Sequence, residues 1–275
     1  MAPDTQGLQA PALNLTVRRF GRVNRVGFVS LYRRELLRLV KDRVDSLLGP
    51  ALANLMFMLV LKVAMGGQQV AAIGLPLADF VAPGLLMFAA GERAFSAGCV
   101  SILFDKMEGM IADVFMAPLT AGERLVAYAG ACVSSGLVAA AITAAVLWPF
   151  AHLGIAHPVA LVAFFLAGTL LQALLGLAAG FWGRRWDHYA AVLGFILIPF
   201  SYLSGMFYPT RGLPPLARGL IDANPLYYVI DGIRYGMTGV TETAPWPGLL
   251  LIVVLDLLLA VLVYRMFQRG WRVKT

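Results

Sequence analysis

Six apolar segments, each about 20 residues long, follow one another along this chain and restrict its fold more than any other feature. They lie near residues 47–65, 80–104, 125–149, 158–182, 190–207 and 247–267. A helix of about 20 residues is long enough to cross the roughly 30 Å hydrocarbon core of a bilayer. Of the 275 residues, 60% are hydrophobic and only 13% are charged, a composition outside the range of soluble domains. The pattern predicts an all-α integral membrane protein whose six transmembrane helices occupy residues 46–267.

The basic residues gather beside the apolar segments. Nine of the 22 Lys and Arg lie between Arg18 and Arg43, and four lie between Arg265 and Lys274. With both termini in the cytoplasm, seventeen basic residues fall on the cytoplasmic side and four outside, as the positive-inside rule requires. The net charge of +7 therefore reports orientation in an inner membrane, with membrane lipids around it, and not a nucleic-acid partner.

The residues before the first apolar segment divide into two parts. Residues 1–26 show no periodicity at their start and are expected to form a disordered or extended tail. Residues 27–45 predict an amphipathic helix at the membrane surface, with its apolar side in lipid. One side carries Val29, Tyr32, Leu36, Leu39 and Val40, and the other carries Arg33, Arg34, Arg38 and Lys41. The pattern leaves open whether this interface helix only anchors the chain or contacts a partner. Residues 268–275 are expected to form a cytoplasmic tail.

The longer of the two cytoplasmic connections runs from Asp105 to Arg124. It places Ile111, Val114 and Phe115 on one side of a short helix that should end before Pro118. Because an apolar face in the cytosol requires a partner surface, we expect this helix to fill a groove on another protein.

The connection between the fifth and sixth segments is unusual because it is rich in proline yet apolar. Its start, "IPFSYLSGMFYPTRGLPP" (residues 198–215), leads into two predicted short helices, near Pro214–Asp222 and Pro225–Met237. Both are too short to span a membrane and too apolar for solvent. Irregular backbone at membrane depth must be covered by protein or face a water-filled cavity. We therefore expect a half-inserted, re-entrant helical hairpin.

Residues 199–240 resemble the late region of the ABC-2 type permeases, the membrane subunits of ATP-driven exporters. The features that carry the resemblance occur in the family's order: Ser204-Gly205 with aromatics, Leu213-Pro214-Pro215, Asn224-Pro225, Tyr227 and Arg234-Tyr235-Gly236. Upstream, Phe80, Pro83 and Gly84 match the start of the family's second span. Glu108, Gly109, Ala117 and Pro118 match its short cytoplasmic helix. The resemblance extends over roughly residues 27–267.

This resemblance implies a permease that works with a second copy of itself and with two separate ATPase subunits, which bind the ATP and Mg²⁺. The chain itself contains no G-x-x-x-x-G-K-[ST] motif, so we expect it to bind no cofactor or metal and to have no catalytic residues. Contact with the ATPase is assigned to Arg33, Arg34, Glu108, Asp113, Phe115 and Pro118. The expected exit aromatics are Tyr202, Phe207, Tyr208, Tyr227 and Tyr228, which fit an interfacial aromatic belt equally well.

Two charges lie halfway along the second segment, in "FAAGERAFSAG". At the centre of a span, Glu92 and Arg93 each cost about 2.5 to 3.5 kcal/mol, so partners or water are expected. Asp256 lies at a similar depth in the sixth segment. We expect Arg93 to pair with Asp256, or with Glu92 through water, and Glu92 to face the substrate cavity. A purely structural role for these charges is the alternative.

Two other classes of function are compatible with the composition. A secondary transporter would usually show internal repeats, and one interrupted region without a repeat argues against it. A membrane-embedded enzyme acting on lipid or glycan needs clustered acids, bases or metal ligands, and the acidic residues show no such spacing. The resemblance leaves the substrate open among polysaccharides, lipid-linked glycans, lipo-oligosaccharides and hydrophobic drugs.

Overall fold

Four helices of the described chain are long and apolar enough to cross a membrane. The structure, a computed structural model, describes residues 24–41, 44–65, 69–70, 74–211 and 213–271, so the predicted tail before residue 24 lies outside it. The four helices are α3 (Leu77–Met107), α5 (Ala121–Leu147), α6 (Pro158–Trp182) and α11 (Pro245–Arg269). Each corresponds to a predicted segment.

The first predicted segment is also a helix, α2 (Val44–Met65), within which Leu48–Ala64 forms a shorter apolar stretch. The fifth segment is not one uniform α-helix. It consists of α7 (Trp186–Val192), the π-helical turn η1 (Leu193–Leu197) and α8 (Ile198–Tyr202). The physical reason is Pro199, which has no N–H and whose ring crowds the preceding turn. The N–H of Ile198 instead bonds to the carbonyl of Leu193, five residues back.

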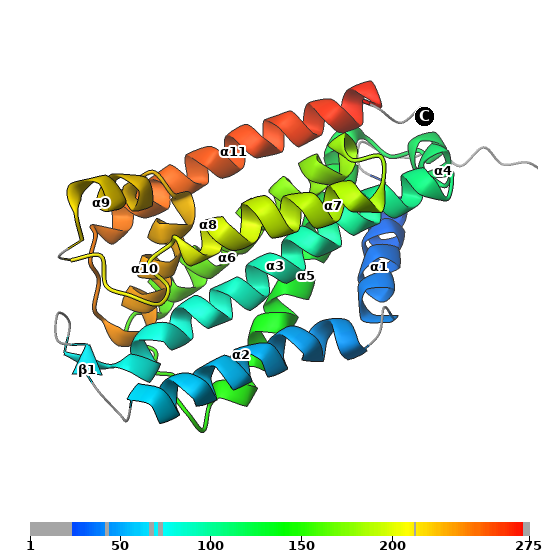
Figure 1. Ribbon diagram of the computed structural model, residues 1–275. Helices are drawn as coiled ribbons and strands as arrows, with labels where there is room; N and C mark the ends of the chain where they lie inside the picture. Colours follow the sequence, from blue (N-terminus) through cyan, green and yellow to red (C-terminus); the bar gives the residue numbers. More distant parts are fainter. Residues whose placement is uncertain (1–23, 42–43, 66–68, 71–73, 212, 272–275) are drawn as a thin grey trace, which may run out of the picture.

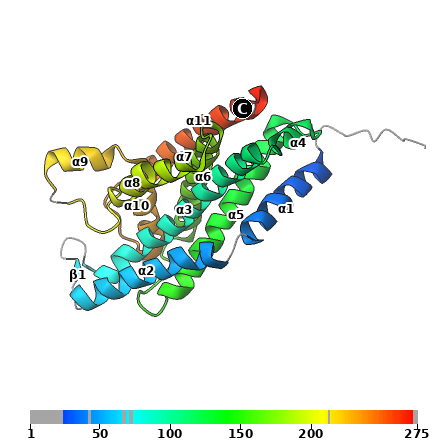
Figure 2. The same cartoon turned by 45° about the vertical axis from the view of Figure 1, so that its right-hand side comes forward.

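Short elements lie at the two ends of the long helices. They are α1 (Arg25–Lys41), α4 (Ile111–Met116), α9 (Pro215–Asp222), α10 (Pro225–Thr238) and the strands β1 (Gln69–Val70) and β2 (Leu75–Pro76). Helices α1 and α4 lie at one end, named the α4 end here, and α9, α10 and the strands lie at the other, the α10 end (Figure 1). The turned view in Figure 2 shows the same division.

Helices α9 and α10 match the two short helices predicted from the prolines. Pro215 and Pro225 each occupy the first turn, where a missing N–H costs nothing. Asn224 caps α10: its side chain accepts from the N–H of Leu226 at 3.0 Å and donates to the carbonyl of Phe200 at 2.6 Å. The chain therefore turns sharply at Asn224 and is tied back to α8.

Helix α3 is the centre of the bundle and packs against both α5 and α6. Small residues make this contact close. A Cβ added at Gly176 of α6 would lie 2.2 Å from the carbonyl oxygen of Phe95, and one added at Gly98 of α3 would lie 2.8 Å from that of Ala173. The backbones of α3 and α6 therefore touch, which is the usual way in which small residues support helix packing in lipid.

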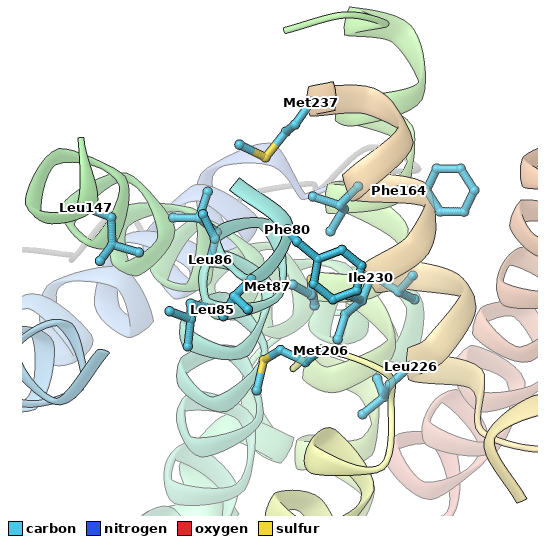
Figure 3. Close-up of a cluster of buried hydrophobic side chains, with 14 of the residues drawn as sticks. Phe80, Leu85, Leu86, Met87, Leu147, Phe164, Met206, Leu226, Ile230 and Met237 are labelled. Atoms are coloured by element: carbon cyan, nitrogen blue, oxygen red, sulfur yellow. The ribbon is translucent and has the colours of Figure 1, made fainter. Parts of the chain in front are cut away.

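A second close contact lies at the α10 end, where Phe80 packs among Ile230, Met206 and other buried side chains (Figure 3). A Cβ at Gly84 would lie 2.2 Å from the Cγ of Met206. Met206 follows Gly205, whose positive φ of 65° lets the chain turn back onto α3. Residues from the start of α3 and from the predicted hairpin thus form one packed unit.

Helix α1 packs differently from the prediction. Leu31 and Glu35 are buried against the bundle, whereas Val29 is exposed. The basic side chains of Arg34 and Arg38 turn toward α3 and bond to Asp105 there. Of the predicted basic side, Arg34 and Arg38 therefore bond within the chain, whereas Arg33 stays exposed. The reason is that Asp105 supplies a buried negative charge that attracts Arg34 and Arg38.

Candidate functional site

A buried cluster of charges joins three helices at the α4 end. Arg34 and Arg38 of α1 donate to the carboxylate of Asp105, at 3.0 and 2.7 Å. Tyr128 of α5 donates to the same carboxylate at 2.9 Å. Arg34 also donates to Glu35 at 2.6 Å, so two negative and two positive side chains meet at the end of α3.

Burial of Arg34 acts to lower the pKa of its guanidinium, but the neighbouring Tyr128, Glu35 and Asp105 outweigh it and raise the pKa above its ordinary value. The guanidinium therefore stays charged. Sequence reasoning assigned Arg34 to a partner surface and missed Glu35, Asp105 and Tyr128. Glu35 was detectable as a single acid within the basic run "YRRELLR".

Helix α4 lies beside this cluster, and its predicted apolar face is not free. Ile111 and Val114 are buried, and the ring of Phe115 packs on that of Phe267 in α11, with centroids 6.3 Å apart. The guanidinium of Arg124 also lies over the Phe115 ring, 4.9 Å from its centroid. The prediction that Phe115 projects into a partner groove is not supported by this packing. The apolar side chain that α4 exposes is Met116, at 80%.

The remaining residues assigned to a partner contact are placed as follows. Arg33, Glu108, Asp113 and Pro118 are exposed at the α4 end. The carbonyl of Pro118 accepts from the side chain of Asn24 at 3.1 Å, and the backbone N–H of Asn24 donates to Glu123 at 2.7 Å. These bonds fasten the start of α1 to the α4–α5 loop.

A cavity of about 410 Å³ separates α1 from α4 and the loop after it. Its lining includes Asn24, Ser30, Arg34, Asp113 and Pro118. Three of the residues predicted for partner contact therefore border one cavity: Arg34 from α1, Asp113 from α4 and Pro118 from the loop after α4.

Glu92 and Arg93 lie near the middle of α3. Arg93 donates through Nε to the hydroxyl of Ser135 on α5 at 2.8 Å. Both residues line a polar cavity of about 250 Å³ that is also bordered by Pro50 of α2 and Tyr189 of α7. The predicted position of Glu92 beside a cavity agrees with this geometry.

Pairing of Arg93 with Asp256 finds no support in these contacts, because Arg93 turns toward α5. Asp256 is 6% exposed on α11, a helix that packs mainly on α6 and α10. Its Oδ1 atom is buried without a hydrogen-bond partner in the described chain. Equal depth along two helices was the basis of the prediction, and depth alone does not say which way a side chain faces.

Two of the predicted exit aromatics form a chain of rings at the α10 end. Phe207 packs on Phe57 of α2 with ring centroids 4.7 Å apart, and on Tyr202 at 5.5 Å. Tyr202 in turn lies 6.1 Å from Phe88 of α3. The rings therefore connect α2, the turn after α8 and α3.

The other three predicted aromatics belong to the hairpin. Tyr227 is buried, and its hydroxyl lies 3.0 Å from that of Thr210. Tyr228 donates to the carbonyl of Asp222 at 2.9 Å, while Tyr208 is half-buried. Burial raises the pKa of the Tyr208 hydroxyl. Tyr227 thus ties α10 to the loop before α9, Tyr228 ties α10 to the end of α9, and neither lines the 250 Å³ cavity.

Sequence reasoning missed a second charge cluster, in which Asp231 of α10 is fully buried. Its carboxylate accepts from the hydroxyl and N–H of Thr243, at 2.7 and 2.9 Å, and from the hydroxyl of Thr241 at 2.6 Å. Arg234 donates to it at 3.4 Å and to the carbonyl of Gly205 at 3.0 Å. The Arg234 guanidinium also lies 3.8 Å from the centroid of the Phe80 ring, a cation–π contact. Arg234 thus joins the hairpin to α3.

Within the part of the chain that the structure describes, no three His, Cys, Asp or Glu side chains gather in a way that could hold a metal ion.

Comparison with known proteins agrees with this arrangement. The family model described as ABC-2 type transporter matches residues 26–238. The inner membrane transport permease YadH of Escherichia coli K12 is 27% identical over 246 residues, which cover 89% of this chain and 96% of that protein. The Shigella flexneri protein of the same name matches equally. The putative transport permease ycf38 of Pyropia yezoensis is 25% identical over 162 residues, 57% of this chain and 54% of that protein. The chain belongs to the ABC-2 type transporter family.

Proposed function

We propose that this chain is the membrane permease of an ATP-driven exporter and that separate ATPase subunits, which bind the ATP and Mg²⁺, supply the energy. The single observation that carries the proposal is the exposed side of α4. Ala112, Asp113 and Met116 face outward on a short helix whose other side is fastened to α5, α11 and α1. A movement imposed on α4 by a partner would therefore reach the bundle directly.

The same end supplies the remaining contacts for the ATPase. Arg33, Glu108 and Pro118 are exposed around α4, and the 410 Å³ cavity between α1 and α4 is large enough for side chains of a partner. Met116 replaces Phe115 as the apolar anchor, since Phe115 packs within the chain. Both termini and α4 then lie in the cytoplasm, and the α10 end faces outward across the inner membrane.

The path through the membrane requires a second copy of the permease, and we place Glu92 and Arg93 along it. The ring chain of Phe57, Phe207 and Tyr202 would close its outer end, with α9 and α10 as the re-entrant hairpin behind it. Aromatic rings held by one another can separate without breaking a buried hydrogen bond, which suits a gate.

The test is co-purification with a soluble P-loop ATPase expressed together with the chain. The purified chain alone should hydrolyse no ATP, and the complex should hydrolyse ATP faster when substrate is present. Met116→Asp should abolish that stimulation while leaving the amount of permease in the membrane unchanged, because a charge is forced into an apolar contact. The matched control is Ile155→Asp, an exposed apolar residue of the α5–α6 connection. ATP hydrolysis by the chain alone, or unchanged coupling in Met116→Asp, would contradict the proposal.

A further inference from the structure

The carboxylate of Glu92 lacks a partner in a place where one is expected. Fifteen residues of α3 precede it, so it lies about 22 Å along the helix at about 1.5 Å per residue. Charged groups at such depth normally pair with one another or face water. Among the described residues, Glu92 has no hydrogen bond and no ion pair, and it borders the 250 Å³ cavity.

Arg93 and Tyr189, two other polar side chains of the cavity, are already engaged. Arg93 donates to Ser135 and has a further interaction besides. Tyr189 donates its hydroxyl hydrogen to Ser96 at 2.9 Å. Adjacent residues of a helix project about 100° apart, so Glu92 and Arg93 do not face each other. The hydroxyl of Ser96, which accepts from Tyr189, keeps one hydrogen to donate. What Glu92 lacks among the described residues is therefore a positively charged partner.

The volume of the cavity shows how much of a molecule it holds. Pockets that enclose a whole drug-sized ligand measure about 300 to 1,000 Å³, and 250 Å³ lies below that range. It is sufficient for a compact head group such as a substituted ammonium. Ala89 and Ala139 in the walls leave this space open, and Tyr189 supplies an aromatic side chain of the kind that attracts cations.

The helices that frame the cavity expose apolar side chains beyond it. On α2 these are Leu52 and Met56, each 53% exposed, and on η1 the ring of Phe195 is 84% exposed. A molecule with its charged group at Glu92 would have apolar surface on both sides for the rest of its length.

We propose that the cavity binds the cationic group of an amphipathic substrate, with Glu92 as its counter-ion and with the apolar part lying along α2 and η1. The proposal rests on the proposed function as a permease and names the substrate class for its path. Among the classes that the family resemblance leaves open, it favours hydrophobic drugs that carry a positive charge over polysaccharides, lipid-linked glycans and lipo-oligosaccharides.

The experiment measures binding to the purified full chain in lipid nanodiscs, without any ATPase, so its result does not depend on coupling. Three probes are compared below their micelle concentrations: dodecyltrimethylammonium, dodecylsulfonate and neutral dodecylmaltoside. The wild-type chain should bind the cation at least tenfold more tightly than the other two. Glu92→Gln should remove that preference, and Glu92→Asp should keep part of it.

The matched control is Asp187→Asn, which removes an exposed carboxylate from α7, the helix that carries Tyr189, and should leave all three affinities unchanged. Thermal unfolding of each variant separates binding from folding. Glu92→Gln should unfold at the same temperature as the wild type or higher, because it removes an unpaired charge. The proposal is overturned if Glu92→Gln keeps the cation preference, if the anion binds more tightly, or if the variant loses stability and all probes alike. Failure of ATPase coupling with the cation preference intact would refute only the exporter assignment.

Discussion

Two buried charge clusters lie at opposite ends of α3, and they are built in different ways. At the α4 end, Asp105 is held by side chains from α1 and α5, which are distant in the sequence. At the α10 end, Asp231 is held largely by the hydroxyls and N–H groups of the loop that follows its own helix. The first cluster links separate helices and the second fixes the shape of one local segment.

The exposure of the arginines follows the same division. The side chain of Arg34 is 38% exposed, whereas that of Arg234 is 1% exposed. Water and nearby acids can therefore compensate if the Asp105 cluster is disturbed. Arg234 is closed off from water and would keep only the Gly205 carbonyl, the Phe80 ring and the charge of Glu242. In the proposed exporter, the Asp105 cluster would be the joint through which the ATPase moves the bundle, and the Asp231 cluster would be the rigid support of α10.

The largest effect is expected for Asp231→Ala. This change removes the carboxylate that pairs with the buried Arg234 and the acceptor of two threonine hydroxyls, so it should cost about 3 to 5 kcal/mol. Thermal unfolding in detergent and the amount of protein in the membrane fraction would measure the loss. Asp222→Ala is the control, because Asp222 is exposed and its contact with Arg218 is 3.8 Å long. Equal loss in both variants would show that the buried cluster has no special role.

A smaller effect is expected for Asp105→Asn, about 2 to 3 kcal/mol. The amide still accepts hydrogen bonds, but bonds to a charged group are worth more than bonds to a neutral one. Stability should fall less than in Asp231→Ala, while ATPase stimulation in the complex should fall strongly. If Asp105→Asn lost as much stability as Asp231→Ala, the proposed difference in role between the Asp105 cluster and the Asp231 cluster would be wrong.

Gly84→Ala tests the packing beneath the hairpin. The added methyl group would meet the Met206 side chain, and overpacking of this kind costs about 1 to 3 kcal/mol. Because the contact is with a buried side chain, Met206→Ala has its own cost of about 2 to 5 kcal/mol, and Gly84→Ala should add little to it in the double variant. Additive losses in the double variant would mean that the added methyl group at residue 84 meets something other than the Met206 side chain.

The smallest effect is expected for Tyr128→Phe, about 1 kcal/mol. The hydroxyl donates to Asp105 and accepts from Arg34 at 2.9 Å, but both charged groups keep each other after its removal. Chemical unfolding gives the free energy of unfolding of this variant and of Asp105→Asn. The difference between the two losses shows how much of the stability of the Asp105 cluster depends on charge. A larger loss of stability in Tyr128→Phe than in Asp105→Asn would show that the neutral hydrogen bonds, and not the charges, hold the Asp105 cluster together.

Much of the fold followed from the sequence because apolar length and proline positions have direct structural meaning. Four of the six predicted segments are helices long enough to span, and Pro215 and Pro225 begin α9 and α10 as expected. The fifth segment was harder to predict, since hydropathy does not register the widened turn before Pro199.

The side-chain partners were less predictable. Helical spacing placed Arg34 and Arg38 on one side of α1 but could not show that Asp105, some 70 residues away, would draw that side inward. The same limit applies to Phe115, whose partner Phe267 comes from the last helix. Glu92 was found because a charge in an apolar span is conspicuous whatever its partners are.

The direct contact between the backbones of α3 and α6 has a mechanical consequence. Where backbone meets backbone, as at Gly98 and Gly176, there are no rotamers to exchange and no room to slide without collision. These two helices should therefore move together as one rigid body when the transporter changes conformation. We therefore expect the movements that open and close the path to occur in α2, which is less tightly packed, and in the segments from α7 to α8. These elements lie on either side of Glu92.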